Sequence, residues 1–107
     1  MKKEEIGLAR GSGNVFRDFG YPNADVIQFK ALLAAEIVKT LDRRKLTVRA
    51  AEKLSGSAGA DFSRVRSADL GRLTVDRLMT MLNRLGSTVE VRIRVRQTPQ
   101  AGELLPA

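Results

Sequence analysis

The sequence contains no cysteine, no histidine and no tryptophan, and aromatic residues make up only 5% of it. Without cysteine there is no disulfide bond, and without cysteine and histidine there is no thiolate or imidazole metal site and no Cys/His or Ser/His catalysis. No stretch stays apolar over the roughly 18 residues that a membrane span requires, and the polar N-terminus does not resemble a secretory signal. We therefore expect a cytoplasmic protein with no cofactor and no membrane partner.

Other catalytic arrangements are missing as well. Acidic residues such as Asp61 and Asp69 are scattered, and the sequence has no paired-carboxylate, Gly-rich phosphate or metal motif. The short GSG segment at Gly11–Gly13 lacks the strand before it and the helix after it that a nucleotide-binding loop needs. The sequence therefore predicts a protein that is not an enzyme.

The charge is strongly one-sided. Lys and Arg number 19 against 12 Asp and Glu, which gives a net charge of +7. Such an excess favours polyanions, chiefly nucleic acid, although it also suits an anionic membrane surface. RNA recognition is less favoured than DNA recognition because the aromatic stacking motifs of RNA-binding modules are missing. A chain of 107 residues is expected to form one domain.

The first strong periodic pattern predicts a helix from Ala24 to Arg43, with Asn23 as its N-cap. Asp25 near its start and Arg43 near its end both suit the helix dipole. Apolar residues recur close to helical spacing and should face the core: Val26, Phe29, Leu33, Ile37 and Leu41, with Leu32 and Val38 beside them. We expect this helix to support the others.

The stretch from Leu46 to Leu78 predicts two short helices joined by a tight turn. Thr47 is positioned to cap the first helix, in which Val48, Ala51 and Leu54 form the inward line. Ser55 and Gly56 should end it, since glycine accepts the left-handed conformation common at helix C-termini.

Ser57 is positioned to cap the second short helix, in which Phe62 and Val65 are the inward pair. Two short helices with a glycine in the turn are typical of a helix-turn-helix, whose second helix enters the major groove of DNA; a helical hairpin of another kind is the alternative. Thr74 should cap a further helix ending at Leu85 and Gly86. Its expected core residues are Leu78, Met81, Leu82 and Leu85.

Residues 88–96 form the one strand signal in the chain. Val89, Val91, Ile93 and Val95 alternate with Glu90, Arg92, Arg94 and Arg96. A single strand cannot satisfy its own hydrogen-bonding groups. We expect it to pair antiparallel with its copy in a homodimer, with the four apolar residues as dimerisation residues; addition to the sheet edge of another protein is the alternative.

The termini differ from this helical region. Residues 1–21 are predicted to form a flexible arm in which Val15, Phe16 and Phe19 are the large apolar residues. These side chains suggest docking, either on the same domain or on a partner. Residues 22–87 form the predicted helix-turn-helix domain, 88–96 the dimerisation strand and 97–107 a disordered tail.

Three segments resemble the Xre-type, lambda-repressor-like helix-turn-helix proteins. LTVRAAEKLSG is similar to their second helix and turn, ADFSRV to their recognition helix, and LTVDRLMTMLNRLG to the helix that follows. The small HigA-type antitoxin-like subgroup also begins with a GSGNVFxDxG segment, here Gly11 to Gly20, and ends in one strand. The resemblance covers roughly residues 10–96. It implies a mainly α bundle of four to five helices and a dimeric operator-binding repressor, often an antitoxin encoded beside a RelE/HigB-like toxin.

The resemblance also implies which residues contact double-stranded DNA. The recognition helix spans about Ala58 to Ser67, and Arg64 is the best candidate for a guanine contact because its forked donors fit O6 and N7 together; a phosphate contact or a solvated charge is the alternative. Thr47 and Arg49 would contact the backbone, and Arg72 would flank them together with Arg44 and Lys45. The full expected DNA-binding set is Thr47, Val48, Arg49, Gly59, Ala60, Ser63, Arg64, Ser67 and Arg72.

The reading helix departs from the family pattern. Val48 stands where Gln is usual, and Ala58, Gly59 and Ala60 replace a polar start. Arg66 replaces a partly buried Leu, and Asp61 would repel phosphate if it faced the groove. Few base-specific donors are left. Either DNA is read through Ser63, Arg64, apolar thymine contacts and DNA shape, or the protein serves mainly to bind and neutralise a toxin.

Overall fold

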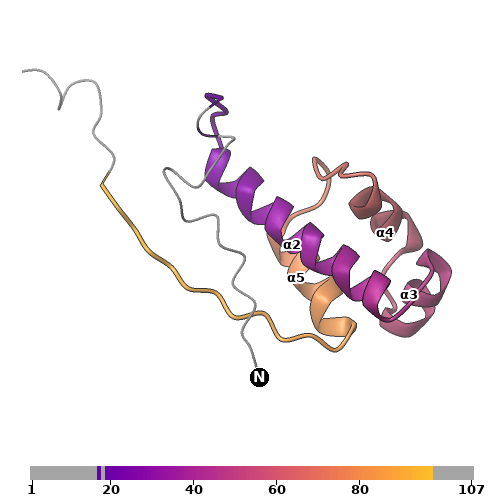
Figure 1. The fold of residues 1–107 in the computed structure, drawn as a ribbon. Coiled ribbons are helices and arrows are strands. Elements are labelled where there is room, and N and C mark those ends of the chain that lie inside the picture. The colour runs from indigo at the N-terminus through magenta and orange to yellow at the C-terminus, as the bar shows by residue number, and fades with distance from the viewer. Residues whose placement is uncertain (1–16, 18, 98–107) are drawn as a thin grey trace, which may run out of the picture.

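The computed structural model describes residues 17 and 19–97, and within them four helices follow one another along the chain (Figure 1). They are α2 (Ala24–Arg43), α3 (Val48–Ser55), α4 (Gly59–Arg66) and α5 (Val75–Arg84). The long helix α2 lies against α5, while α3 and α4 lie together near its C-terminal end, with α4 also in contact with α2. None of these helices is long and apolar enough to cross a bilayer. The predicted mainly helical bundle is confirmed for this part of the chain.

One connected core joins all four helices. Its fully buried members include Ile37 and Leu41 of α2, Phe62 of α4 and Leu78 of α5. Ala51 of α3 is fully buried in the same cluster. The predicted inward pair of α4 is confirmed, because Val65 is buried beside Phe62. The predicted core residues of α5, among them Met81 and Leu82, are confirmed as well.

Two predicted inward residues are wrong. Val26 is 45% exposed, because it lies in the first turn of the 20-residue α2, which projects beyond the 10-residue α5 that covers the rest (Figure 1). Leu54 is 51% exposed. The inward line of α3 instead follows Val48, Ala51 and Ser55, at spacings of three and four residues, so Leu54 lies at the edge of that face.

Three of the four predicted N-cap residues, Asn23, Thr47 and Thr74, stand at the predicted position, and two of them make a side-chain capping bond. The Thr47 hydroxyl accepts a hydrogen bond from the Ala50 amide at 3.0 Å, and the Thr74 hydroxyl accepts one from the Arg77 amide at 3.2 Å. Among the described residues, however, the Asn23 side chain makes no capping bond to α2. Ser57 is buried one position before Ala58, which is the N-cap residue of α4 and has no side-chain acceptor. The cap predicted at Ser57 is therefore wrong.

Three helices end in the same hydrogen-bonded motif, in which a residue in the left-handed conformation lies two positions after the last helical residue. In α5 this residue is Gly86, as predicted, with φ of 92°. In α2 it is Lys45 and in α4 it is Ala68, with φ of 53° and 57°. At the end of α4 the Ala68 amide donates to the Val65 carbonyl at 3.1 Å, and the Asp69 amide donates to the Arg64 carbonyl at 2.8 Å. The backbone at the end of α4 is thereby closed without a glycine.

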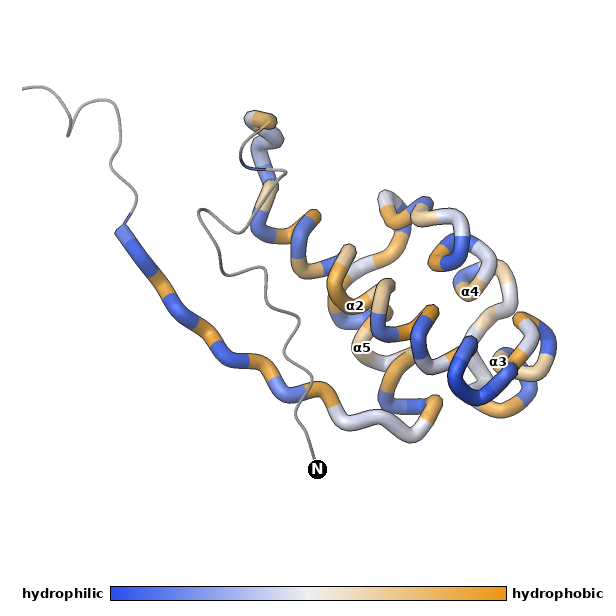
Figure 2. The backbone as a smooth tube through the Cα atoms, viewed as in Figure 1, coloured by the Kyte–Doolittle hydropathy of each residue, from blue (hydrophilic) through white to orange (hydrophobic). Residues whose placement is uncertain are grey.

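Residues 88–97 leave the bundle as an extended segment (Figure 1). Within residues 19–97 no strand is assigned, so the strand predicted at 88–96 is not formed by the single chain. Figure 2 shows the predicted alternation of apolar and polar residues along this segment. Val89 packs against the core, but Ile93 and Val95 are more than 80% exposed. A lone extended segment has no second strand to complete its backbone hydrogen bonds, and pairing across a dimer stays a prediction.

The predicted arm and tail fall mostly beyond these residues. Val15 and Phe16, and residues 98–107, lie outside the described residues, whereas Phe19 lies within them and is exposed.

Candidate nucleic-acid interface

The turn between α3 and α4 is fixed by its own side chains. The Ser55 hydroxyl donates to the Ala51 carbonyl at 2.6 Å and accepts from the Ser57 amide at 3.0 Å. Gly56 adopts the left-handed conformation with φ of 75°, as the sequence predicts. Ser57 is buried under this turn. These contacts set the direction in which the chain enters α4.

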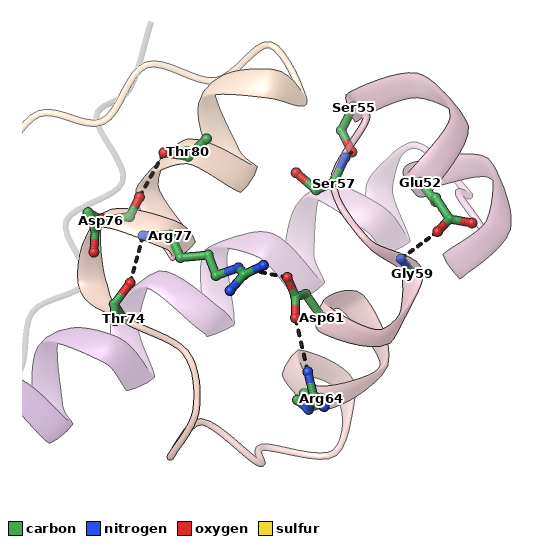
Figure 3. Close-up of polar contacts among 10 residues, drawn as sticks. All are labelled: Glu52, Ser55, Ser57, Gly59, Asp61, Arg64, Thr74, Asp76, Arg77 and Thr80. Carbon is green, nitrogen blue, oxygen red and sulfur yellow. Dashed lines mark hydrogen bonds and ion pairs between the residues drawn. The ribbon is translucent and has the colours of Figure 1, made fainter.

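Glu52 of α3 supplies the cap that the start of α4 otherwise lacks. Its carboxylate accepts a hydrogen bond from the Gly59 amide at 2.8 Å (Figure 3). A Cβ at Gly59 would lie 3.2 Å from the Glu52 Oε2 atom, which is tighter than an ordinary contact. A side chain at position 59 would therefore require the Glu52 carboxylate to shift. One signal in the sequence points to such a cap: the Ala58 side chain has no acceptor, so another group must meet the first amides of α4.

The outward face of α4 carries four of the predicted DNA-contacting residues. Ala60, Ser63 and Ser67 are exposed and Arg64 is partly exposed, at the three- and four-residue spacing of one helix face. The Ser67 hydroxyl donates to the Ser63 carbonyl at 2.9 Å, so its proton is already used. Within the described residues the Ser63 hydroxyl has no hydrogen-bond partner. Ser63 is thus the hydroxyl donor on this face that is open to a ligand.

Asp61 is buried and holds two arginines (Figure 3). Its Oδ1 atom lies 3.1 Å from the Arg64 Nη1 atom, and its Oδ2 atom lies 2.9 Å from the Arg77 Nε atom of α5. Asp61 therefore does not project into a groove as an unpaired negative charge. Arg64 also differs from the freely exposed side chain that its position suggested, because it is held at the surface by the residue three positions earlier.

Other predicted residues lie around α4 with different degrees of freedom. Arg49, early in α3, and Arg72, in the loop before α5, are exposed and have no ion-pair partner among the described residues. The Thr47 hydroxyl already caps α3. Val48 is partly buried against the core, which leaves it less side chain for DNA. Of the set, Arg49 and Arg72 are the best placed to meet phosphate.

Two further arginines have structural partners. The Arg44 guanidinium donates to the Leu85 carbonyl at 2.6 Å, which ties the end of α2 to the end of α5. Arg66 of α4 pairs with Asp42 of α2 at 2.9 Å, an ion pair between exposed groups. Sequence reasoning missed both partners, and it missed Arg77, because contacts between helices far apart in the chain leave no local pattern.

The start of α5 also carries a perturbed carboxylate. A hydrogen bond with the Thr74 hydroxyl is the main cause that lowers the pKa of the exposed Asp76 below its ordinary value. The Thr80 hydroxyl donates to the Asp76 carbonyl at 2.8 Å (Figure 3). These contacts order the first turn of α5, the turn from which Arg77 reaches Asp61.

The chemistry available at this surface is hydrogen bonding and charge. No group of three metal-ligating side chains lies together within residues 17 and 19–97. A short helix, a glycine turn and a second short helix with one face buried and the other exposed define a helix-turn-helix protein.

Comparison with known proteins agrees with this class. The family described as "Helix-turn-helix domain" matches residues 15–94, well over half of the chain, and the protein belongs to this family. No curated protein and no solved structure matches the chain.

Proposed function

We propose that the protein is a transcriptional regulator that binds double-stranded DNA through α4, as an antitoxin-like repressor of the Xre type. One observation carries the proposal. Ala60, Ser63, Arg64 and Ser67 share the outward face of α4, while Phe62 and Val65 anchor its other face in the core. This is the arrangement in which a recognition helix presents side chains to a major groove.

The available side chains separate into those that would contact phosphate and those that would contact bases. Arg49 and Arg72 would neutralise phosphates, which provides affinity that falls as salt rises. Ser63 and Arg64 would read base edges, and the Ala60 methyl group would contact a thymine methyl. Because so few side chains reach the bases, we expect DNA shape to supply part of the sequence preference.

A homodimer would place two such surfaces on one operator. Val91, Ile93 and Val95 expose a continuous apolar line on the extended segment. An antiparallel pair of these segments around a two-fold axis would give each backbone hydrogen-bond partners along one edge. The operator would then be palindromic, with half-sites about 34 Å apart, one turn of the duplex.

A fluorescence anisotropy titration tests the proposal. The intact protein is titrated with a duplex from its own promoter and with a scrambled duplex of the same composition, at several salt concentrations. We expect tighter binding to the promoter at every salt concentration and weaker binding to both duplexes as salt rises. Equal affinity for the two duplexes would reject sequence-specific regulation.

A second function is favoured by a separate surface. Phe19, Tyr21 and Val26 are exposed before and at the start of α2. Exposed large apolar residues suit a protein partner, and under this alternative the chain neutralises a RelE/HigB-like toxin and binds DNA weakly. Co-expression with the neighbouring open reading frame tests the alternative: a small toxin-like protein should co-purify with the chain, and should no longer do so with Phe19→Ser and Tyr21→Ser together.

A further inference from the structure

The Asp61 carboxylate occupies an unusual position for a charged group on a reading helix. It lies in the first turn of α4, and its side chain is only 5% exposed. A buried carboxylate requires partners for its lone pairs, because burial removes it from water. Arg64 meets one oxygen and Arg77 meets the other.

The two arginines do different things for this carboxylate. Arg77 comes from α5, so its contact fixes Asp61 relative to the rest of the bundle (Figure 3). Arg64 comes from the same helix, one turn later. An arginine side chain has many rotamers, and one contact with a fixed carboxylate removes much of that freedom before any ligand binds. Asp61 thereby decides where the Arg64 guanidinium lies.

The contact leaves Arg64 able to bind a second group. The Arg64 side chain is 34% exposed, and the contact to Asp61 runs through its Nη1 atom. A guanidinium has five N–H donors in one plane, so the remaining donors include a pair suited to two acceptors side by side. Guanine presents such a pair in the major groove, O6 and N7.

We propose that Asp61 is a positioning residue for base recognition: held by Arg77, it orients Arg64 so that α4 prefers guanine at one position of each half-site. The inference rests on the proposed DNA binding by α4. The Asp61 carboxylate offsets only one of its two arginine partners, so the three side chains together carry a net charge of +1, and further cations are needed for strong non-specific attraction to phosphate. Arg49 and Arg72, which have no ion-pair partner in the described part of the chain, would provide that attraction.

The test measures base preference separately from overall affinity. The intact protein selects duplexes from a randomised library, and the dissociation constants of the selected site and of its single-base variants are then measured by anisotropy. We expect one guanine per half-site to be selected. Asp61→Asn should reduce the preference for that guanine at least tenfold, roughly the loss of a good bidentate contact, and should not weaken binding to a random duplex, because it removes a negative charge from this face.

Arg77→Gln is the matched control. It removes the link from α4 to α5 but keeps the carboxylate beside Arg64, so Tm should fall, and the guanine preference should fall by less than in Asp61→Asn. A merely structural role for Asp61 would instead make the base preference follow Tm in both variants. Arg64→Lys keeps the charge without the fork and should lose the preference at the same position.

Folding of each variant is checked by circular dichroism before binding is measured. If Asp61→Asn does not fold, Asp61→Glu keeps the charge and moves it by one methylene, and the guanine preference should still fall. A guanine preference unchanged in a folded Asp61 variant would overturn the inference while the proposed DNA binding stands. Selection of no site by the unaltered protein would overturn both.

Discussion

The α3–α4 corner, residues 48–66, and the extended segment, residues 88–97, differ in how many of their polar and apolar side chains find partners within the chain. In the corner, the Glu52 carboxylate caps α4, Asp61 binds two arginines, and Phe62 is fully buried. Within the described residues no buried side-chain polar atom lacks a hydrogen-bond partner. In the segment, Ile93 and Val95 face solvent. The comparison teaches that the corner finds partners for its polar and apolar groups within one chain, whereas the segment leaves large apolar side chains exposed.

Phe62→Ala should have the largest effect on stability, because it removes a fully buried side chain from the α3–α4 corner. Removing a fully buried phenylalanine leaves a cavity and costs about 3–5 kcal/mol of unfolding free energy. Urea unfolding followed by circular dichroism measures this loss. Phe19→Ala is the matched control, since Phe19 is 78% exposed and its removal should cost less than about 0.5 kcal/mol. Equal losses for the two variants would contradict the buried anchor of α4.

Ile93→Asp should weaken pairing through the extended segment without unfolding the α3–α4 corner. If the segment pairs with its copy, two isoleucines lose burial in each dimer, about 3 kcal/mol or more in total, and the dimer dissociation constant rises more than a hundredfold. Sedimentation velocity measures the change in assembly, and circular dichroism should show the same helix content.

Arg94→Gln is the control for Ile93→Asp, because it alters the polar side of the same segment and should leave the dimer largely intact. An unaltered protein that sediments as a monomer at every concentration would exclude pairing through this segment.

The same contrast explains which features the sequence could predict. Some features depend on residues within one or two turns of the chain. They are the bounds of α2, the hydroxyl caps at Thr47 and Thr74, and the burial of Phe62 and Val65. Local spacing and capping preferences are sufficient for these features. The alternation at 89–96 is likewise local, but whether a strand forms depends on a partner, and one sequence does not reveal it.

The missed features all depend on contacts between elements. Glu52 reaches Gly59 across the turn, and Arg77 reaches Asp61 from a helix 16 residues further along the sequence. Periodicity predicts that Leu54 and Val26 face the core, but both are exposed. Periodicity gives the direction of a side chain and not how far the neighbouring helix extends. The candidate site was therefore predicted as a set of positions, without the ion pairs that decide which of its side chains are mobile.

Glu52→Ala tests how much the cap on α4 contributes to the stability of the α3–α4 corner. Loss of the carboxylate leaves the Gly59 amide without its acceptor, and we expect a loss of about 1 kcal/mol, as for other N-cap deletions. Thermal unfolding measures it. Lys53→Ala is the neighbouring control, because Lys53 is exposed with no partner in the described residues and should change stability by less than about 0.5 kcal/mol. A harmless Glu52→Ala would show that water caps α4 equally well.

Ala68→Gly should stabilise the protein by a smaller amount, about 0.5–1 kcal/mol, because alanine is strained in the left-handed conformation and glycine is not. The same replacement at Ala60, an exposed position inside α4, should destabilise by a similar amount, since glycine in a helix loses more backbone freedom on folding. Urea unfolding of the two variants compares them directly. The same sign of change in both would contradict the left-handed backbone at Ala68.

The smallest expected effect concerns pH and the exposed Asp76. The hydrogen bond with Thr74 lowers the folded pKa of Asp76 below its ordinary value of 3.8, so the carboxylate stabilises the fold above that pH. The stabilisation is lost as pH falls through the lower, folded pKa, because both states are then protonated. Asp76→Asn should therefore lower Tm at pH 7 but have little effect once the pH is well below 3.8. In a Thr74→Ala background the same substitution should show a weaker pH dependence, because the hydroxyl that lowers the pKa is gone. A Tm difference that stays constant from neutral to acidic pH would show that Asp76 acts through packing, and the start of α5 would then owe its order to the Thr74–Arg77 cap alone.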